Sequence, residues 1–360
     1  MILKKYKNNL RPLFTLLALA IMLFGGANLV GAQVQRGKLF DFTGSGRTSF
    51  VTLAANNGPI TWTIAGNPQD PRPNQAFIRQ FVYGNSLLDF IVPEDYIGDT
   101  KADPTVWREE NGTYFVAQTP VGTGGINVER AVQWGALGDD PTGVGDYDGD
   151  GRADFTVVRD TGNVFVWYIM SSSTNTMRAI PFGATTAGNP NNAITDIFPG
   201  ADFNGDGRDE LVFVAVPADQ LKTTFFIGDA VTGAGVLTRD FGAFISDVVV
   251  PPDDYTGDGR ADLVTVRETD GSPAIWFILN VAANTFTSTR FGIADASFGT
   301  TFDRPVRGDY DGDGRHDVAV FRNSNQTFYW INSSNPSTFG TQQMPTTVRG
   351  IALASLENFF

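Results

Sequence analysis

The chain has 360 residues, with 40 Gly, 19 Pro and no Cys, and its 39 acidic side chains outnumber the 26 basic ones. The absence of Cys excludes disulfides, iron–sulfur clusters and thiolate zinc sites, and a single His leaves little for His-based metal or triad chemistry. The excess of acid argues against nucleic acid as a partner, while 42% hydrophobic residues are enough for a folded core.

The first 32 residues predict an export signal. Four basic residues precede position 12, an apolar run covers Leu13 to Phe24, and small residues end at Ala32. We expect cleavage after Ala32, which leaves residues 33–360 as one domain, secreted, periplasmic or on the cell surface, with no membrane span. Cleavage removes those four basic residues and no acidic ones, so the net charge changes from −13 to −17. The alternative is an uncleaved anchor, because the apolar stretch reaches about 18 residues if it includes Gly25 and Gly26.

The remainder of the chain contains six copies of an acidic, Gly-rich nonapeptide. Neighbouring copies start 51 to 56 residues apart, so a length that suggests two domains is instead one array of repeats. The copies are DFTGSGRTS from Asp41, DYIGDTKAD from Asp95, DYDGDGRAD from Asp146, DFNGDGRDE from Asp202, DYTGDGRAD from Asp254 and DYDGDGRHD from Asp309. Positions below are counted from the first residue of the nonapeptide, so positions 1 to 9 are the nonapeptide and higher numbers follow it.

Each nonapeptide precedes two short β-branched or aromatic segments separated by a turn, such as Asn111-Gly112 or Asp270-Gly271. A further strand and a variable loop follow, and residues 33–360 show no helical periodicity. Four strands in about 54 residues predict an all-β fold, a β-propeller of six four-stranded blades. The segment TTVRGIALAS at 346–355 is either the first strand of a seventh blade or the strand that closes the ring against the N-terminus.

Aromatic residues recur at fixed places in the unit, and we expect them to pack between blades rather than to form a ligand platform. An aromatic-Gly pair closes most units: Tyr83-Gly84, Trp134-Gly135, Phe182-Gly183, Phe241-Gly242, Phe291-Gly292 and Phe339-Gly340. The six Trp fall on the strands or at these pairs: Trp62, Trp107, Trp134, Trp167, Trp276 and Trp330.

The nonapeptide has the donors of a calcium loop. In the copy at Asp146, carboxylates stand at positions 1, 3, 5 and 9, the carbonyl of position 7 adds an oxygen, and glycines allow the backbone to curl. Oxygen ligands in that number favour Ca²⁺ over transition metals, and Mg²⁺ needs a stricter octahedron. The loop is not an EF-hand, because position 12 is Val157 where an EF-hand needs an acid.

The D-x-[DN]-x-D-G-x-x-D loops at Asp146, Asp202 and Asp309, the relaxed copy at Asp254 and the aromatic-Gly pairs resemble the FG-GAP, or VCBS, family of calcium-binding propeller repeats. That family is similar to the integrin alpha-chain head and to some propeller lectins. The resemblance covers about residues 36 to 350. It implies that each loop joins the first and second strands of a blade.

We expect about four calcium sites, because the copies differ in their acids. A fifth site at Asp95, Asp99 and Asp103 is doubtful, since position 3 is Ile97, and the copy at Asp41 retains one carboxylate and predicts no ion. The expected ligands are Asp146, Asp148, Asp150, Arg152, Asp154, Asp202, Asn204, Asp206, Arg208, Glu210, Asp254, Thr256, Asp258, Arg260, Asp262, Asp309, Asp311, Asp313, Arg315 and Asp317, where each Arg contributes its carbonyl.

Two further features allow alternatives. Position 14 is Arg in four copies, and these side chains either pair with a following acid at the end of a strand or form a ring that binds an anion or sugar; they are Arg108, Arg159, Arg267 and Arg322. The single His, His316, occupies position 8 of the last loop, and we expect it to be an exposed loop residue.

The sequence favours a monomeric, non-enzymatic module that binds an extracellular protein or glycan, with structural calcium. The competing hypotheses are a propeller-based polysaccharide lyase or glycosidase and a propeller lectin. No nucleophile elbow, phosphate loop or His cluster accompanies the acids. Fold alone does not separate these functions.

Overall fold

The computed structural model describes residues 39–355 apart from 56, 68–69, 71–77, 121–125, 186–187, 190–191, 218–220, 245, 270–271 and 295–302. The predicted export signal and the turn at Asp270-Gly271 lie outside these residues. The described residues belong to a compact unit that spans Gln35–Phe360. Within them, no helix is long and apolar enough to cross a membrane.

The described residues form six antiparallel sheets, which we call blades 1 to 6. From the inner to the outer strand, blade 1 contains β23 (Ile351–Ala352), β1 (Phe50–Ala55), β2 (Pro59–Ala65) and β3 (Ile78–Asn85), and blade 2 contains β4 (Asp89–Ile91), β5 (Thr105–Arg108), β6 (Thr113–Gln118) and β7 (Asn127–Gln133). Blade 3 contains β8 (Phe155–Asp160), β9 (Val164–Met170) and β10 (Met177–Ala184), and blade 4 contains β11 (Asn192–Ala201), β12 (Glu210–Pro217), β13 (Thr224–Gly228) and β14 (Gly235–Asp240). Blade 5 contains β15 (Asp247–Asp253), β16 (Asp262–Arg267), β17 (Pro273–Asn280) and β18 (Thr285–Ile293), and blade 6 contains β19 (Asp303–Val306), β20 (Val318–Arg322), β21 (Thr327–Ile331) and β22 (Phe339–Gln343).

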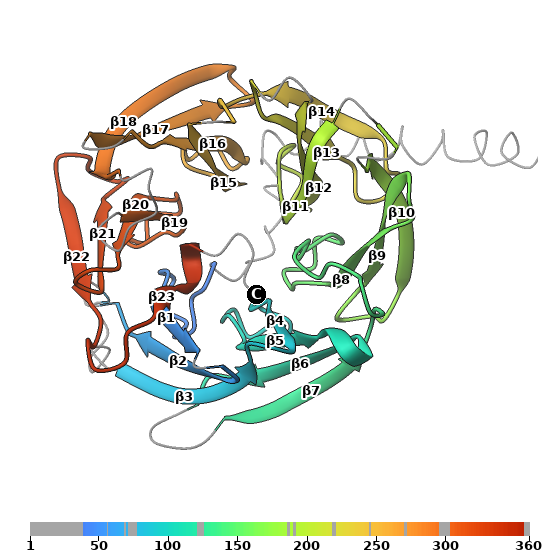
Figure 1. The fold of residues 1–360 in the computed structure, drawn as a ribbon, viewed down its shortest axis with the longest axis horizontal. Helices are drawn as coiled ribbons and strands as arrows, with labels where there is room; N and C mark the ends of the chain where they lie inside the picture. Colours follow the sequence, from blue (N-terminus) through green and yellow to red (C-terminus); the bar gives the residue numbers. More distant parts are fainter. Residues whose placement is uncertain are drawn as a thin grey trace, which may run out of the picture. The chain divides into compact units, whose positions relative to one another are not determined.

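The blades stand in a ring within this unit, with β4, β11, β15 and β19 toward the centre and β3, β7, β18 and β22 at the rim (Figure 1). Blade 3 has three strands, and two isolated bridges, Asp140 to Val158 and Gly145 to Asp154, occupy the place of its inner strand. Helical structure in the described residues is limited to two 3₁₀ turns, η1 (Glu109–Asn111) and η2 (Leu353–Ser355). The predicted six-bladed propeller is confirmed.

Blade 1 is completed by a strand from the far end of the chain. Strand β23 pairs antiparallel with β1, with Leu53 opposite Ile351 and Thr52 opposite Ala352. The segment at 346–355 therefore closes the ring and does not begin a seventh blade.

The core lies between neighbouring blades. One cluster joins Trp107 and Tyr114 of blade 2 to Phe155 and Val157 of blade 3, and similar clusters fill the other junctions. Five of the six Trp are at most 1% exposed, which confirms their packing role: Trp62, Trp107, Trp167, Trp276 and Trp330. Burial on both faces explains why the strands are continuously apolar.

The aromatic-Gly pairs anchor this core. In four blades, a Trp indole N–H donates to the carbonyl of the aromatic residue of the pair, as from Trp62 to Tyr83 over 2.8 Å. The predicted pair Phe339-Gly340 is wrong as a member of this series, because it begins β22 and Phe339 is 71% exposed. Met344, which is 2% exposed, follows β22 where the other units have their aromatic residue.

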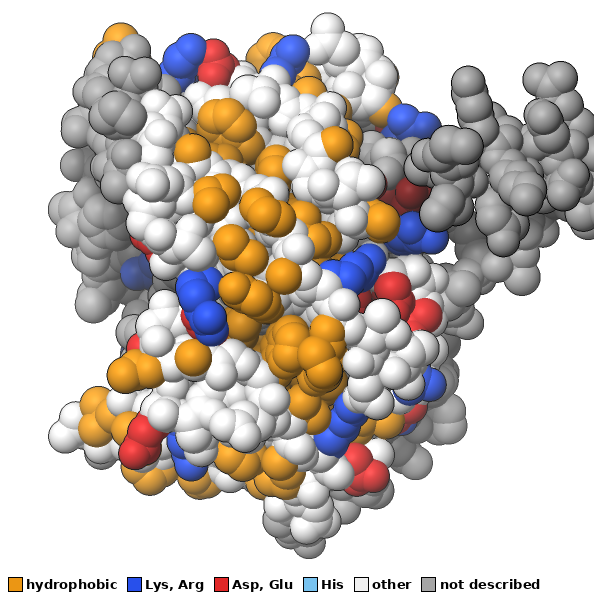
Figure 2. Space-filling view, turned by 90° about the vertical axis from the view of Figure 1, so that its right-hand side faces the viewer, with side chains coloured by type: hydrophobic (Ala, Val, Ile, Leu, Met, Phe, Trp, Pro, Cys, Tyr) orange, Lys and Arg blue, Asp and Glu red, His pale blue; other side chains and the backbone are white. Residues whose placement is uncertain are grey.

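The outer strands expose apolar side chains to solvent. Figure 2 shows such side chains gathered on the side of the ring that faces right in Figure 1, among scattered charged groups. Each outer strand contributes at least one exposed large hydrophobic residue, including Ile78, Val128, Met177, Val236, Phe286 and Phe339.

Candidate metal centres

Each nonapeptide forms a loop held by the carboxylate at position 1. In blade 6, Asp309 accepts the N–H groups of Gly312 over 2.5 Å and Gly314 over 2.8 Å. The loop at Asp146 uses the same two bonds, to Gly149 and Gly151. All the described loops precede the second strand of their blade, as the resemblance implies.

The acid at position 9 closes the loop from its other end. Asp317 accepts the N–H groups of Tyr310 over 2.7 Å and Asp311 over 3.1 Å, and it also accepts the N–H of Ser333. These bonds tie positions 2 and 3 to the start of the second strand. Position 9 is 2% exposed or less in the copies at Asp95, Asp146, Asp202, Asp254 and Asp309.

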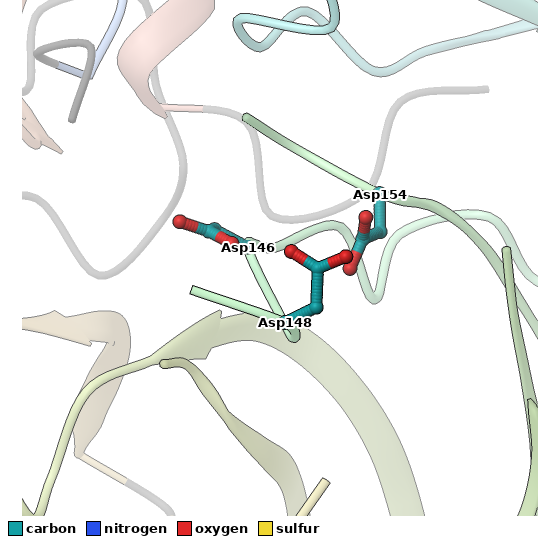
Figure 3. Close-up of side chains that lie close together, drawn as sticks. All are labelled: Asp146, Asp148 and Asp154. Carbon is teal, nitrogen blue, oxygen red and sulfur yellow. The ribbon is translucent and has the colours of Figure 1, made fainter. Parts of the chain in front are cut away.

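Two loops bring three carboxylates together. In blade 3, Asp146, Asp148 and Asp154 each place an oxygen within 4.8 Å of the others, and Asp309, Asp311 and Asp317 do the same in blade 6. Figure 3 shows the carboxylates of Asp148 and Asp154 turned toward each other, with Asp146 beside them.

The buried acids of these groups are electrostatically costly without a cation. Burial, reinforced by the carboxylate of Asp148, raises the pKa of Asp154 to about 8. Burial and the carboxylate of Asp311 raise the pKa of Asp317 to about 7. A raised pKa means that the environment disfavours the charged form, so a bound cation would offset this cost. Oxygen donors alone, converging at short range, fit Ca²⁺.

Position 5 lies outside both groups. Asp150 accepts the N–H of Arg152 over 3.0 Å and also the hydroxyl of Ser173, while Asp313 pairs with Arg315 over 2.6 Å. The structure thus brings together positions 1, 3 and 9 of the expected ligand set. The ligand roles of position 5 and of the position 7 carbonyl remain predictions.

The loops at Asp202 and Asp254 have neutral side chains at position 3, and each of these side chains contains one oxygen atom that could bind a metal ion. The Nδ2 group of Asn204 donates to Glu210 over 2.6 Å, and its Oδ1 accepts the N–H of Asp206 over 2.8 Å. Burial raises the pKa of Glu210 to about 7. Thr256 lies 3.4 Å from Asp262 and accepts the amide of Asn280, and burial raises the pKa of Asp262 to about 7. Both loops keep the backbone hydrogen bonds of the acid-rich copies, at Asp202 and Asp254.

The six loops are joined in a closed cycle of backbone hydrogen bonds. In every loop the N–H at position 8 donates to the carbonyl at position 1 of the preceding loop, and the last loop accepts from the first. The bonds run from Ala102 to Asp41 (3.0 Å), Ala153 to Asp95 (2.8 Å), Asp209 to Asp146 (2.9 Å), Ala261 to Asp202 (2.7 Å), His316 to Asp254 (2.8 Å) and Thr48 to Asp309 (2.8 Å).

Side chains reinforce the same cycle. The position 7 cation of each loop packs over the position 4 glycine of the preceding loop, as Arg152 does on Gly98 and Arg315 on Gly257. A Cβ at either glycine would overlap the neighbouring Arg side chain, and both glycines have positive φ. The position 4 glycine therefore serves contact between loops as well as curvature within one.

The Arg residues at position 14 do not pair with the acids that follow them, so that predicted pairing is wrong. Each forms two hydrogen bonds to an upstream Asp on the first strand or its approach: Arg108 with Asp89, Arg159 with Asp139, Arg267 with Asp247 and Arg322 with Asp303. The physical reason is strand register, which sets three of these pairs directly opposite one another. Each guanidinium also lies over an aromatic ring of the third strand.

The same Asp residues bind the chain after an aromatic-Gly pair. Asp247, for example, accepts the N–H of Ala243 over 2.9 Å, directly after Phe241-Gly242. Sequence reasoning missed this role, although an Asp stands six or seven residues before position 1 in these four copies and in the copy at Asp202. The prediction that His316 is exposed is also wrong, because it is 8% exposed and lies 3.2 Å from Asp253.

A profile of the FG-GAP-like repeat matches residues 146–213 and 254–320. The chain is thus a six-bladed propeller that contains FG-GAP-like repeats. The two matched stretches contain the four loops for which the sequence predicts calcium, and the loops at Asp41 and Asp95 lie outside them.

A search of curated proteins finds no match. Among solved structures, the propeller is similar to Kuenenia stuttgartiensis hydrazine synthase (TM-score 0.43, 11% identity, 86% of this chain and 81% of that chain covered). It is also similar to the Dos1 propeller, with a TM-score of 0.33, 10% identity, and 87% of this chain and 75% of that chain covered. For the rhamnogalacturonan lyase YesW, the TM-score is 0.34 and the identity 12%, with 84% of this chain and 60% of that chain covered. Similarity at this level carries no argument about activity.

Proposed function

We propose that this FG-GAP propeller is an exported, calcium-binding module that binds an extracellular protein or glycan without turning it over. The observation that carries the proposal is the pair of three-carboxylate groups at Asp146 and Asp309, set in loops that are hydrogen-bonded around the ring. Calcium there would neutralise buried charge and fix the loops. A rigid face of loops loses little entropy when it binds a partner.

The proposed stoichiometry is four ions, at the loops that begin at Asp146, Asp202, Asp254 and Asp309. Four Ca²⁺ would bring the net charge of residues 33–360 from −17 to about −9. The acidity of the chain is then largely a set of ligands rather than an open surface for cationic partners.

Metal analysis after dialysis tests the calcium assignment. The purified protein, equilibrated in micromolar calcium, should retain about four ions per chain, and D148N with D311N should reduce this number by about two. Protein that retains no calcium under these conditions contradicts the proposal.

A glycan array and a screen for polysaccharide degradation separate the binding module from the alternatives. We expect a ligand retained in calcium and lost in EGTA, with no product released. Turnover of any polymer would instead support a propeller-based lyase or glycosidase.

A further inference from the structure

Five charged or ionisable residues depart from the repeat at three positions around the loops. The residue directly before the loop is small or apolar in four copies but is Glu94 and Asp253 in two. The residue before that is Arg307 in the last copy, and position 8 is Asp209 or His316 where three copies have Ala. None of these side chains belongs to the predicted ligand set or to the Asp–Arg pairs. We call these five residues, with Tyr255, the axial group.

The axial group comes together from four blades. His316 of blade 6 lies 3.2 Å from the carboxylate of Asp253 in blade 5, and the rings of Tyr255 and His316 meet edge to face at 5.3 Å. Burial raises the pKa of Glu94 to about 8; Arg307 opposes this shift, and Asp209 and Asp253 add to it. This influence agrees with the strand positions, which bring residues of blades 2, 4, 5 and 6 toward one region. The inner strands that lead to these residues surround the centre of the ring (Figure 1).

Two buried donors of the axial group have no acceptor among the described residues. They are Nε of Arg307 and the hydroxyl of Tyr255, and each side chain belongs to a residue that is 6% exposed. The equivalent Tyr96, Tyr147 and Tyr310 each donate to a carbonyl of their own blade. Buried donors are normally satisfied, so these two indicate a polar ligand atom nearby. Solvent reaches the group at the carboxylate of Asp253, because the side chain of Asp253 is 38% exposed.

The charges of the group narrow the chemistry of the ligand. An anion would meet the carboxylates of Glu94, Asp209 and Asp253, and a bare metal ion would meet the guanidinium of Arg307. Within the described residues, these acids also do not form a three-carboxylate group of the kind seen at Asp146. A hydroxyl donates one hydrogen bond and accepts others, so a ligand rich in hydroxyls can satisfy carboxylate acceptors and Arg and Tyr donors together.

We propose that the axial group binds a neutral saccharide unit, with Glu94 and Asp253 accepting from its hydroxyls and Arg307 and Tyr255 donating to them. This inference rests on the proposed binding function and names its ligand class. The saccharide would lie where the inner strands β4, β15 and β19 end.

Titration calorimetry on the calcium-loaded full chain tests the proposal with four probes: cellohexaose, xylohexaose, maltohexaose and hexagalacturonate. We expect at least one neutral hexasaccharide to bind. R307Q should weaken this binding about tenfold or more, as expected for a lost charged hydrogen bond. Y255F should weaken it severalfold without lowering Tm, because no described residue accepts a hydrogen bond from that hydroxyl.

Two matched variants control for indirect effects. Y96F removes a hydroxyl that is bonded to Val92, and R239Q removes a guanidinium from the outer strand β14, so neither should change the affinity. Binding of hexagalacturonate alone, or no binding of any neutral probe, overturns the proposal. Neutral binding that is unchanged in both R307Q and Y255F overturns the axial site but leaves the proposed binding function intact.

Discussion

The first and last loops of the chain are neighbours in the ring and differ most in charge. The loop at Asp309 has carboxylates at positions 1, 3, 5 and 9, whereas the loop at Asp41 has Thr43, Ser45 and Ser49 at the last three. Their hydrogen bonds are nevertheless equivalent. Ser49 accepts the N–H of Phe42 as Asp317 accepts that of Tyr310, and Ser45 accepts that of Arg47 as Asp313 accepts that of Arg315.

This comparison separates shape from charge. A hydroxyl at positions 5 and 9 is enough to hold the loop, so the additional carboxylates of the last loop are not required for its conformation. They are stabilising only if a cation offsets their repulsion. Acid-rich loops should therefore respond to calcium, and the first loop should not.

Removing calcium is expected to have the largest effect. EGTA should lower Tm by about 10–20 °C, because each of the four proposed sites contributes on the order of 2–3 kcal/mol when it is well saturated. D146A combined with D309A should lower Tm in calcium and reduce the further response to EGTA by about half, because the loops at Asp202 and Asp254 keep their proposed ions. Differential scanning calorimetry in calcium and in EGTA measures both effects. Identical melting in the two buffers would refute the assignment of these loops.

The first loop supplies the control for that experiment. D41A removes the same kind of backbone acceptor, since Asp41 accepts the N–H groups of Thr43 and Gly46. It should lower Tm equally with and without calcium. A calcium-dependent loss in D41A would contradict the separation of shape from charge.

The Asp–Arg pairs should contribute a calcium-independent share of stability. Although burial opposes it, hydrogen bonds from Arg267 hold the pKa of Asp247 below its usual value. D247A strands the guanidinium and the N–H of Ala243, so we expect a loss of about 2–3 kcal/mol in the free energy of unfolding. Urea denaturation in calcium and in EGTA measures it. A loss seen only in calcium would mean that the pair acts through the metal loops.

Calcium should also change how stability depends on pH. The folded-state pKa values of Asp154 (about 8) and Asp317 (about 7) lie above the ordinary carboxyl value, so the native state holds protons that the unfolded state has released. Metal-stripped protein should therefore lose stability as pH rises from about 5 to 8, and saturating calcium should remove most of this slope.

Asp103 offers a test within the same titration. Burial raises its pKa to about 8, and its loop is the one for which calcium is doubtful. Melting curves in saturating calcium should show a residual slope of Tm against pH that D103N reduces. If D103N has no effect on that slope, the second loop belongs with the calcium-responsive group.

The smallest expected effect comes from adding a charge to a relaxed loop. T256D gives the loop at Asp254 the position 3 carboxylate of Asp148 and Asp311, and an Asp there can still accept from Asn280. Tm should rise by about 1–2 °C in calcium and fall by a similar amount after chelation. A shift of the same sign in both buffers would show that the added carboxylate does not meet the ion.

The sequence predicts the repeat well because each blade is a local unit. Loop, strand and aromatic positions recur within 51 to 56 residues, so the four strands and the buried Trp residues could be predicted from spacing alone. Contacts that depend on register or on ring closure could not. The partner of Arg267 is Asp247 because β15 and β16 place them opposite one another, and no periodicity shows that alignment.

The candidate site divides in the same way. In the loops at Asp146 and Asp309, the acids at positions 3 and 9 lie close together, as a short loop predicts. Asp150 instead accepts a hydrogen bond from Ser173, which lies in the turn between strands β9 and β10, and the loop sequence does not indicate this contact. The burial of His316 depends on neighbouring blades, because its N–H bonds to Asp254 and its ring meets Tyr255. These contacts between blades carry no local signal in the sequence.

The pairing of Leu53 with Ile351 has a consequence for biosynthesis. On the ribosome, β1 is made early but its inner neighbour β23 is made last, so blade 1 keeps an open edge throughout translation. A polypeptide truncated before Ile351 would retain that edge, which could pair with the same edge of another nascent chain. Pairing of β23 with β1 therefore covers a strand edge that a chain truncated before Ile351 would leave exposed.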